Sequence, residues 1–365
     1  MSGNGTRASI RPSFVEPKSL VFWAFVGLVV YGIVWTVNED LSRWGGQTAG
    51  ILASTIVWLL YGLFVGWLLY HLQLFKHRPA SAVVAGLLWG GFVAGAGSII
   101  GGVGFESLIL KWYGAEFASA WASAIRAPLM EEGLKILGVI ALALIPRVRF
   151  SSVLDGLFYG TILGLGFTVT ENIIYTNVTI ALSGGVDVVG SIAGVMITRG
   201  ILGAMLGHMV LTGITGAGIG YFVSRRGKPM LNRAMPAVAL FGVGAFFHFL
   251  QNSPILESLG LASMIVKGIP ALITLLVLAK WGRREERKHF YAIGHSLDEG
   301  LISEGELAGL ATRRTRRKAR KRSGDRGHMK SLQRSQLQLL NAIDAYGSGS
   351  REVAAAGELV ASTKR

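Results

Sequence analysis

The 365-residue chain is 51% hydrophobic and only 16% charged, and it is strongly basic, with a net charge of +15. Its mean hydropathy of +0.48 excludes an ordinary soluble domain, because a soluble chain of this length carries far more polar side chains. The sequence contains no cysteine, which excludes disulfides, thiolate metal ligands and a cysteine nucleophile. Any catalysis must therefore use oxygen or imidazole groups.

Apolar segments long enough to cross a hydrocarbon core of about 30 Å recur along the chain, at about 20 residues each. They predict an all-α, polytopic membrane helix bundle of about eight transmembrane helices. No small-residue cleavage site follows the first segment, so we interpret it as a retained anchor. The predicted segments are residues 20–37, 50–73, 81–103, 127–145, 153–175, 199–223, 235–252 and 261–281.

These segments divide the chain into an N-terminal part, residues 1–19, a transmembrane domain, residues 20–282, and a basic tail, residues 283–365. Between the third and fourth segments, aromatic residues at helical spacing predict an interfacial helix over residues 104–125. The tail contains the basic run Arg313–Arg322. So close to a membrane, such a run favours contact with anionic lipid headgroups, and we expect no nucleic acid partner.

The loops predict the orientation of the chain, because short cytoplasmic loops keep Lys and Arg and translocated loops lose them. Every second connection is rich in basic residues, and the connections between them have few or none. Both termini are therefore expected in the cytoplasm of a multi-pass plasma membrane protein. The basic groups on the predicted cytoplasmic side are Arg7, Arg11 and Lys18, then Lys76 and Arg78, then Arg147 and Arg149, then Arg225, Arg226, Lys228 and Arg233, and finally the tail.

Glu131, Glu132 and Lys135 lie in the first turns of the fourth segment. A charged side chain inside a membrane costs roughly 2.5–3.5 kcal/mol, so each requires a reason. Lys135 is one turn after Glu131 and can pair with it, which would make this a structural ion pair. Two carboxylates against one lysine leave excess negative charge, which favours a functional role. Adjacent glutamates on an α-helix point about 100° apart, so we do not expect both to face one spot equally.

Three further polar sites lie in the apolar segments. Glu171 is near the end of the fifth segment, and it has a structural interpretation as a polar residue that reaches the membrane surface. His208 is in the sixth segment, and His248 precedes Asn252 by one turn in the seventh. A single histidine between helices is more often structural than catalytic.

The predicted topology brings these sites to one level. The fourth and sixth segments run from outside to inside, and the fifth and seventh run in the opposite direction. Glu131 then lies about 8 Å inside the outer boundary, and Glu171, His208 and His248 also fall in the outer half of the membrane. Independent structural residues have no reason to share one depth, so the shared level indicates a single site.

A glutamate can take a proton from water, while histidine and asparagine side chains can stabilise an oxyanion, so the set suits hydrolysis. We assign Glu131 as the leading general base, with Glu132 or Glu171 as helper, and His208, His248 and Asn252 as the groups that position the water or the oxyanion. Histidine and glutamate are also zinc ligands. No HExxH pair is present, so a divalent metal is possible but unsupported, and no cofactor is expected.

The motifs and their order resemble the PrsW-type intramembrane proteases, which are related to the CAAX prenyl endopeptidases and to the scaffold subunit of gamma-secretase. The resemblance covers about residues 120–255. EExxK is present as Glu131, Glu132 and Lys135; FxxxEN as Phe167, Glu171 and Asn172; and the histidine motifs as His208 and as His248 with Asn252.

The resemblance implies endoproteolysis of a membrane-bound protein substrate, such as an anti-sigma factor, cut near its extracytoplasmic side. The CAAX endopeptidases have a histidine where this chain has Glu171, which argues against prenylated substrates. Two alternatives remain open from the residues themselves. Intramembrane acids and histidines also build proton- or ion-coupled transporters, although no internal repeat is visible here. The chain could also be a non-catalytic membrane scaffold.

Overall fold

The computed structural model describes residues 12–73, 78–203 and 206–364. Within these ranges the regular structure is helical, without strands, so the all-α prediction is confirmed. The chain divides into two compact units. The membrane unit comprises Pro12–Tyr70 and Arg78–Lys280, and the tail unit consists mainly of the residues after Lys280.

The helices of the membrane unit follow one another with short connections. Three π-helical stretches interrupt or join them: η2 (Trp89–Ala94), η3 (Pro128–Glu132) and η5 (Met196–Leu202). The α-helices that begin in this unit are α1 (Leu20–Trp44), α2 (Thr48–His71), α3 (Ala80–Leu88), α4 (Gly95–Ala127), α5 (Gly133–Leu144), α6 (Val153–Leu182), α7 (Val188–Val195), α8 (His208–Ser224), α9 (Met230–Asn252) and α10 (Leu261–His295).

Six helical runs in the described part of the chain are long and apolar enough to cross a membrane. One of them, Ala80–Leu144, has 65 residues, far more than a single crossing needs, and it contains two of the predicted segments. α8 coincides with the sixth predicted segment but has only 17 residues. These helices agree with a polytopic bundle, and the number of eight crossings stays a prediction.

The region expected to form one interfacial helix over residues 104–125 is built differently. Residues 104–113 continue the helix that begins at Gly95, and the helical path breaks at Gly114, where φ is 82° and ψ is 171°. A side chain would strain this backbone conformation, which glycine adopts at no steric cost. Gly114 therefore lets α4 bend within the predicted outer loop.

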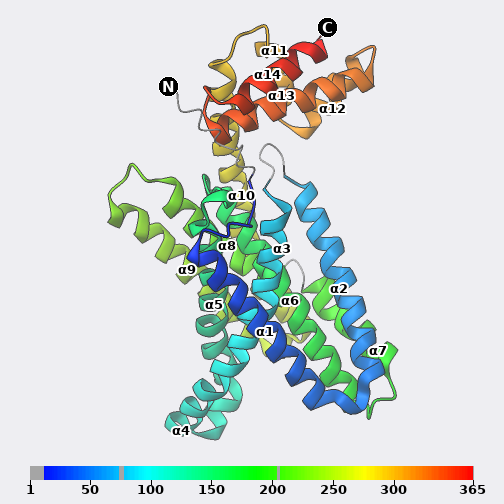
Figure 1. The fold of residues 1–365 in the computed structure, drawn as a ribbon. Coiled ribbons are helices and arrows are strands. Elements are labelled where there is room, and N and C mark those ends of the chain that lie inside the picture. The colour runs from blue at the N-terminus through cyan, green and yellow to red at the C-terminus, as the bar shows by residue number, and fades with distance from the viewer. Residues whose placement is uncertain (1–11, 74–77, 204–205, 365) are drawn as a thin grey trace. The chain divides into compact units, whose positions relative to one another are not determined.

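α6 is the central helix of the membrane unit, with α2 and α9 farther out (Figure 1). Nearly every residue from Val153 to Thr170 is buried, which explains why this segment lacks a polar face. A capping box between Ser152 and Asp155 begins the helix. The Asp155 carboxylate also lies 2.8 Å from the guanidinium of Arg78, and both side chains are almost fully buried. This pair fixes where α6 begins.

α6 and α8 pack with their backbones nearly in contact, because glycines line the face of α6 that meets α8. A Cβ added at Gly160 would lie 2.1 Å from the carbonyl oxygen of Thr212, and one at Gly164 would lie 2.3 Å from that of His208. Small residues permit such approaches between helices in lipid. Gly164 therefore sets the distance from α6 to the backbone of His208.

The tail unit contains the end of α10 and four further helices: α11 (Glu304–Leu310), α12 (Arg313–Arg322), α13 (Arg326–Tyr346) and α14 (Arg351–Lys364). They surround an apolar cluster of their own. Its buried members include Phe290 from α10, Leu307 from α11, Leu339 from α13 and Val360 from α14. The residues that the sequence indicated as a basic tail thus form a packed helical unit.

We predict that Gly164→Ala lowers the stability of the protein by about 1–3 kcal/mol, because the new methyl group forces α6 away from the start of α8. Thermal unfolding of the purified protein in detergent measures the change. Gly27→Ala in α1 is the matched control, since no atom lies within 4 Å of its added Cβ. Equal melting temperatures for both variants would refute the close approach.

Candidate functional site

The first two glutamates of the site sit at the junction of η3 and α5. Glu131 and Glu132 end the π-helical stretch, and Lys135 follows in the first turn of α5. The Lys135 Nζ lies 2.9 Å from Glu132 Oε1 and 3.4 Å from Glu131 Oε2. Both glutamates thus face one spot, contrary to the expectation for a regular α-helix. A π-helical turn, with its i→i+5 bonds, is wider than an α-helical one and re-aims the side chains, and such turns are common at functional sites.

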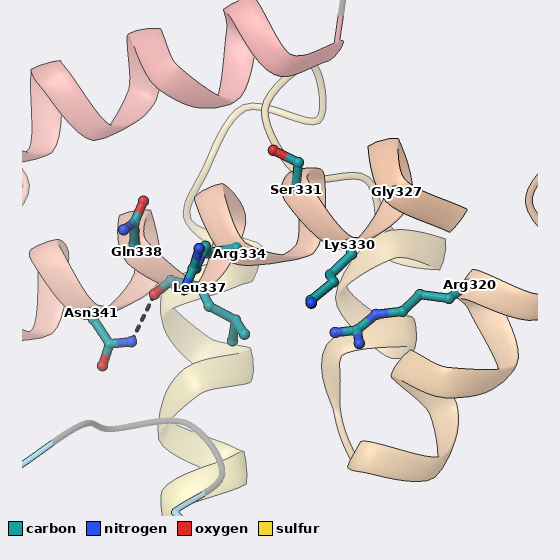
Figure 2. Close-up of a pocket in the computed structure, with 8 residues that line it drawn as sticks. All are labelled: Arg320, Gly327, Lys330, Ser331, Arg334, Leu337, Gln338 and Asn341. Atoms are coloured by element: carbon teal, nitrogen blue, oxygen red, sulfur yellow. Dashed lines mark hydrogen bonds between the residues drawn. The ribbon is translucent and has the colours of Figure 1, made fainter. Parts of the chain in front are cut away.

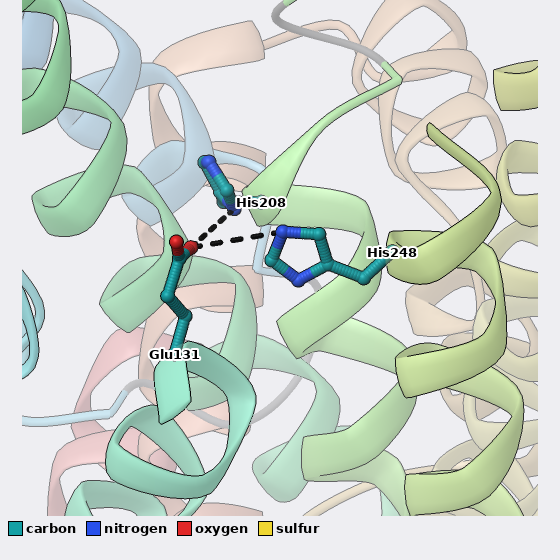
Figure 3. A group of neighbouring side chains, drawn as sticks. All are labelled: Glu131, His208 and His248. Atoms are coloured by element: carbon teal, nitrogen blue, oxygen red, sulfur yellow. Dashed lines mark ion pairs between the residues drawn. The ribbon is translucent and has the colours of Figure 1, made fainter. Parts of the chain in front are cut away.

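Two histidines from other helices meet Glu131. His208 is the first residue of α8, and its Nδ1 lies 3.9 Å from Glu131 Oε2. His248, in α9, places its Nε2 3.6 Å from the same oxygen. One ligand atom from each of the three residues lies within 4.8 Å of the others. Figure 3 shows the two histidine rings beside the Glu131 carboxylate. Residues from three separate parts of the sequence therefore form one group.

Each histidine ring has a carboxylate at the nitrogen that faces away from Glu131. Glu171 Oε2 lies 2.9 Å from Nε2 of His208, and Glu132 Oε1 lies 3.2 Å from Nδ1 of His248. Carboxylates in this position select the tautomer and orientation of a histidine and make its other nitrogen a better base or ligand. In His248 the nitrogen nearer Glu131 is Nε2, which has no hydrogen-bond partner among the described residues, whereas the corresponding nitrogen of His208, Nδ1, lies 3.0 Å from the Lys135 ammonium.

Lys135 connects these parts. Its ammonium is fully buried, lies 3.0 Å from Nδ1 of His208, and sits 3.7 Å from the centre of the Phe167 ring. Phe167 also meets His208 edge to face, with ring centres 4.7 Å apart. The predicted supporting residues Lys135 and Phe167 therefore lie inside the site.

Arg199 is a site residue that the sequence analysis did not identify. Its guanidinium forms an ion pair with Glu171, and its Nε donates a hydrogen bond to Asn172 Oδ1 at 2.8 Å. It also stacks over the ring of Tyr175. The available signal was a basic residue at the outer start of the sixth apolar segment, where the predicted loops carry few basic residues. Arg199 holds Glu171 in place behind His208.

Thr212 is a second residue that the sequence did not reveal. It lies one turn after His208 on α8, and its hydroxyl donates a 2.9 Å hydrogen bond to Glu132 Oε2. With Lys135 on the other oxygen, Glu132 has a partner at each carboxylate oxygen. Glu132 is fully buried and best suited to an orienting role.

Asn252 does not join this group in the structure. It is the last residue of α9, one turn beyond His248, and it is exposed. Within the described residues, no polar contact connects it to the glutamates or the histidines. The oxyanion role expected for Asn252 thus has no geometric support, whereas Asn172 is fully buried beside Glu171.

The site contains three carboxylates, from Glu131, Glu132 and Glu171, and two permanent cations, from Lys135 and Arg199. One negative charge is therefore not balanced. Glu131 is the least compensated of the three, because its closest contact is the 3.4 Å approach of Lys135. It is also only 7% exposed, so water balances its charge poorly.

A buried carboxylate beside two oriented imidazoles, inside a membrane-embedded helix bundle, defines the class of intramembrane hydrolytic enzymes. The family model of the PrsW family intramembrane metalloproteases matches residues 78–280, more than half of the chain. The chain belongs to this family and is a membrane protease. The matched range includes every site residue described above, and membership favours a protease over the transporter and the scaffold. No curated protein and no solved structure matches the chain.

We predict that Lys135→Met lowers the stability of the protein by about 3–5 kcal/mol, because it leaves buried carboxylates without their cation. Adding Glu132→Gln to this variant should restore part of the loss, since one of the unpaired charges is then removed. Chemical denaturation of the purified protein measures both variants. Glu106→Gln, which breaks the exposed pair with Arg126, is the control and should cost less than about 1 kcal/mol. A loss from Lys135→Met no larger than this control would contradict the buried network.

We predict that Arg199→Lys lowers the cleavage rate at least about tenfold while the stability changes by less than about 1 kcal/mol. Lysine keeps the charge, but it cannot hold Glu171 and Asn172 together as the planar guanidinium does. Proteolysis in reconstituted vesicles measures the rate. Full activity in this variant would show that the orientation of Glu171 is unimportant.

Proposed function

We propose that this protease hydrolyses a peptide bond of a membrane-anchored protein at the centre formed by Glu131, His208 and His248. The observation that carries the proposal is the convergence of these three residues, from three helical elements, within 4.8 Å. An anti-sigma-factor-like, single-pass membrane protein fits the resemblance noted in the sequence.

The site is accessible from one end. The side chains of Glu171 and Arg199 are 20% and 32% exposed, whereas those of Glu132 and Lys135 are fully buried. Glu171 lies in the second half of α6, which the basic loops orient toward the outer face of the plasma membrane with both termini in the cytoplasm. This exposure supports cleavage near the extracytoplasmic side.

Without a metal, Glu131 is the proton acceptor in the proposed reaction. Its polar contacts, to Lys135, His208 and His248, all run to Oε2, so Oε1 remains available to a water molecule. Because its side chain is only 7% exposed, this carboxylate is poorly hydrated and reactive toward a proton donor. Both histidines lie beside Oε2, and the fully buried Lys135 ammonium, paired with Glu132, holds the two glutamates in position.

The same three residues are suited to a divalent metal ion. Two imidazoles and one carboxylate are a common zinc donor set, and each ring has a carboxylate behind it. His248 is almost fully buried, and Glu132 lies 3.2 Å from its Nδ1, which leaves Nε2, on the side of Glu131, for a ligand role. Lys135 is the competing observation, because its ammonium lies 3.0 Å from His208 Nδ1.

We therefore propose a metal-bound form of the site, in which Glu131, His208 and His248 would hold the metal that the family description implies, and Glu131 is then a ligand and not the proton acceptor. When bound, a zinc ion polarises a peptide carbonyl and lowers the pKa of a water molecule to about 7. Glu132 and Glu171 orient the two rings, and Lys135 stays paired with Glu132. This assignment strengthens the case for a metal, which the sequence left without support.

We predict that Glu131→Gln abolishes proteolysis, with a loss of at least about a thousandfold, because the amide accepts a proton very poorly. Mass spectrometry of new N-termini in membranes from cells that produce either form measures cleavage of whichever membrane protein is the substrate. Glu116→Gln, at an exposed glutamate of α4, is the control and should leave the pattern unchanged. Identical cleavage products with wild type and Glu131→Gln would overturn the proposal.

Removal of the metal tests the proposed metal site separately. Exhaustive dialysis of the purified wild type against a chelator should abolish cleavage, and added Zn²⁺ should restore it. Glu131→Gln should hold less metal than Glu116→Gln, because it loses one ligand. Activity that persists in metal-free protein would refute the metal and leave Glu131 as a base that acts without it.

A further inference from the structure

The tail unit contains a basic pocket between α12 and α13. The pocket has a volume of about 600 Å³. Three of its eight lining residues are cationic, Arg320, Lys330 and Arg334, and none is acidic. Figure 2 shows Arg320 and Lys330 extending toward each other from α12 and α13. The pocket thus concentrates positive charge from two helices in one hollow.

A buried glutamine fixes the guanidinium of Arg320 at this pocket. The Nε of Arg320 donates a 2.6 Å hydrogen bond to Oε1 of Gln333, and Nε2 of Gln333 donates to the backbone carbonyl of Arg316. Gln333 is only 3% exposed. These bonds join α12 to α13 and hold Arg320 in place, so little side-chain freedom would be lost on binding a ligand.

The arrangement of charge is unfavourable unless an anion is bound. Lys330 and Arg334 are four residues apart on α13, where like charges repel each other. The nearby carboxylate of Asp325 is engaged elsewhere, since it accepts hydrogen bonds from the backbone N–H groups of Gly327 and His328. No carboxylate of the pocket lining balances the three cations.

The crowding of cations extends along α12. Burial, together with the neighbouring charges of Arg320 and Arg313, lowers the pKa of Arg316 to about 10. Arg316 is outside the pocket lining but lies one turn before Arg320 on α12, so an anion bound at Arg320 would reduce this repulsion.

We propose that this pocket binds a phosphate monoester group. Such a group carries close to two negative charges near neutral pH and presents three oxygen atoms, which matches the three cations of the pocket lining better than a singly charged phosphodiester does. The guanidinium of Arg320 can bind two of these oxygens, Lys330 and Arg334 can supply point charges, and the hydroxyl of Ser331 can donate a hydrogen bond. The headgroup of phosphatidic acid and soluble phosphorylated compounds both carry this group.

Calorimetric titration of the full-length protein in phosphatidylcholine nanodiscs tests the site. The probes are glycerol 3-phosphate, dihexanoyl phosphatidic acid and, as the phosphodiester, dihexanoyl phosphatidylglycerol. We expect saturable binding of one equivalent of a monoester probe and at least about tenfold weaker binding of the phosphodiester. Tighter binding of the lipid than of glycerol 3-phosphate indicates a headgroup ligand, and equal binding indicates a soluble one.

The pocket variant Lys330→Gln with Arg334→Gln should weaken monoester binding at least about tenfold. The matched control is Arg317→Gln with Lys318→Gln, which removes the same charge from exposed residues of α12 outside the pocket lining. The control should stay within about twofold of wild type. Circular dichroism verifies that both variants keep their helices. Absence of saturable binding, equal losses in both variants, or equal binding of the phosphodiester would each overturn the proposal.

Discussion

The buried ammonium of Lys135 is the interaction on which the rest of the site depends. A lysine in a bilayer interior is expensive unless it is paired, and here it is paired with Glu131 and Glu132 and also touches the rings of His208 and Phe167. These groups come from three of the predicted apolar segments. Without the cation, the carboxylates would repel one another, and nothing else in the site contacts all of these groups. In the sequence, the pair of Lys135 and Glu131 had a structural interpretation. In the structure, the same lysine also holds the residues of the site together.

The conformation of the backbone brings the residues of this network together. Glycines on α6 bring its backbone against the start of α8, so that Phe167 and Glu171 reach His208. The π-helical turn before α5 directs two adjacent glutamates to one place, and a second π-helical stretch carries Arg199 to Glu171. Tight packing costs little in lipid when the contact residues are small. The glycines and the π-helical stretches, which would weaken a regular helix, thus position the residues of the site.

The sequence predicted the site residues whose burial in a membrane is energetically costly. Glu131 and His248 were recognisable because polar groups are rare in apolar segments, and the loop charges indicated their common depth. Arg199 was not recognised, because at the edge of a segment a basic residue has an ordinary explanation in the polar headgroups. The π-helical turns leave no periodic pattern that can be distinguished from that of a regular helix. Asn252 is one helical turn from His248 in the sequence motif, but it lies exposed at the end of α9, so its predicted oxyanion role has no geometric support.

The central claim is that Glu131, His208 and His248 act as one centre, and the non-additivity of their substitutions tests it most directly. The measurement is the cleavage rate constant of Glu131→Gln, His208→Gln, His248→Gln and the triple variant in reconstituted vesicles. Residues that act as a unit lose almost everything when any one is removed. The account predicts that each single variant is nearly as slow as the triple variant. Losses that multiply, with the triple variant slower by the product of the three single effects, would show three independent residues and would contradict it.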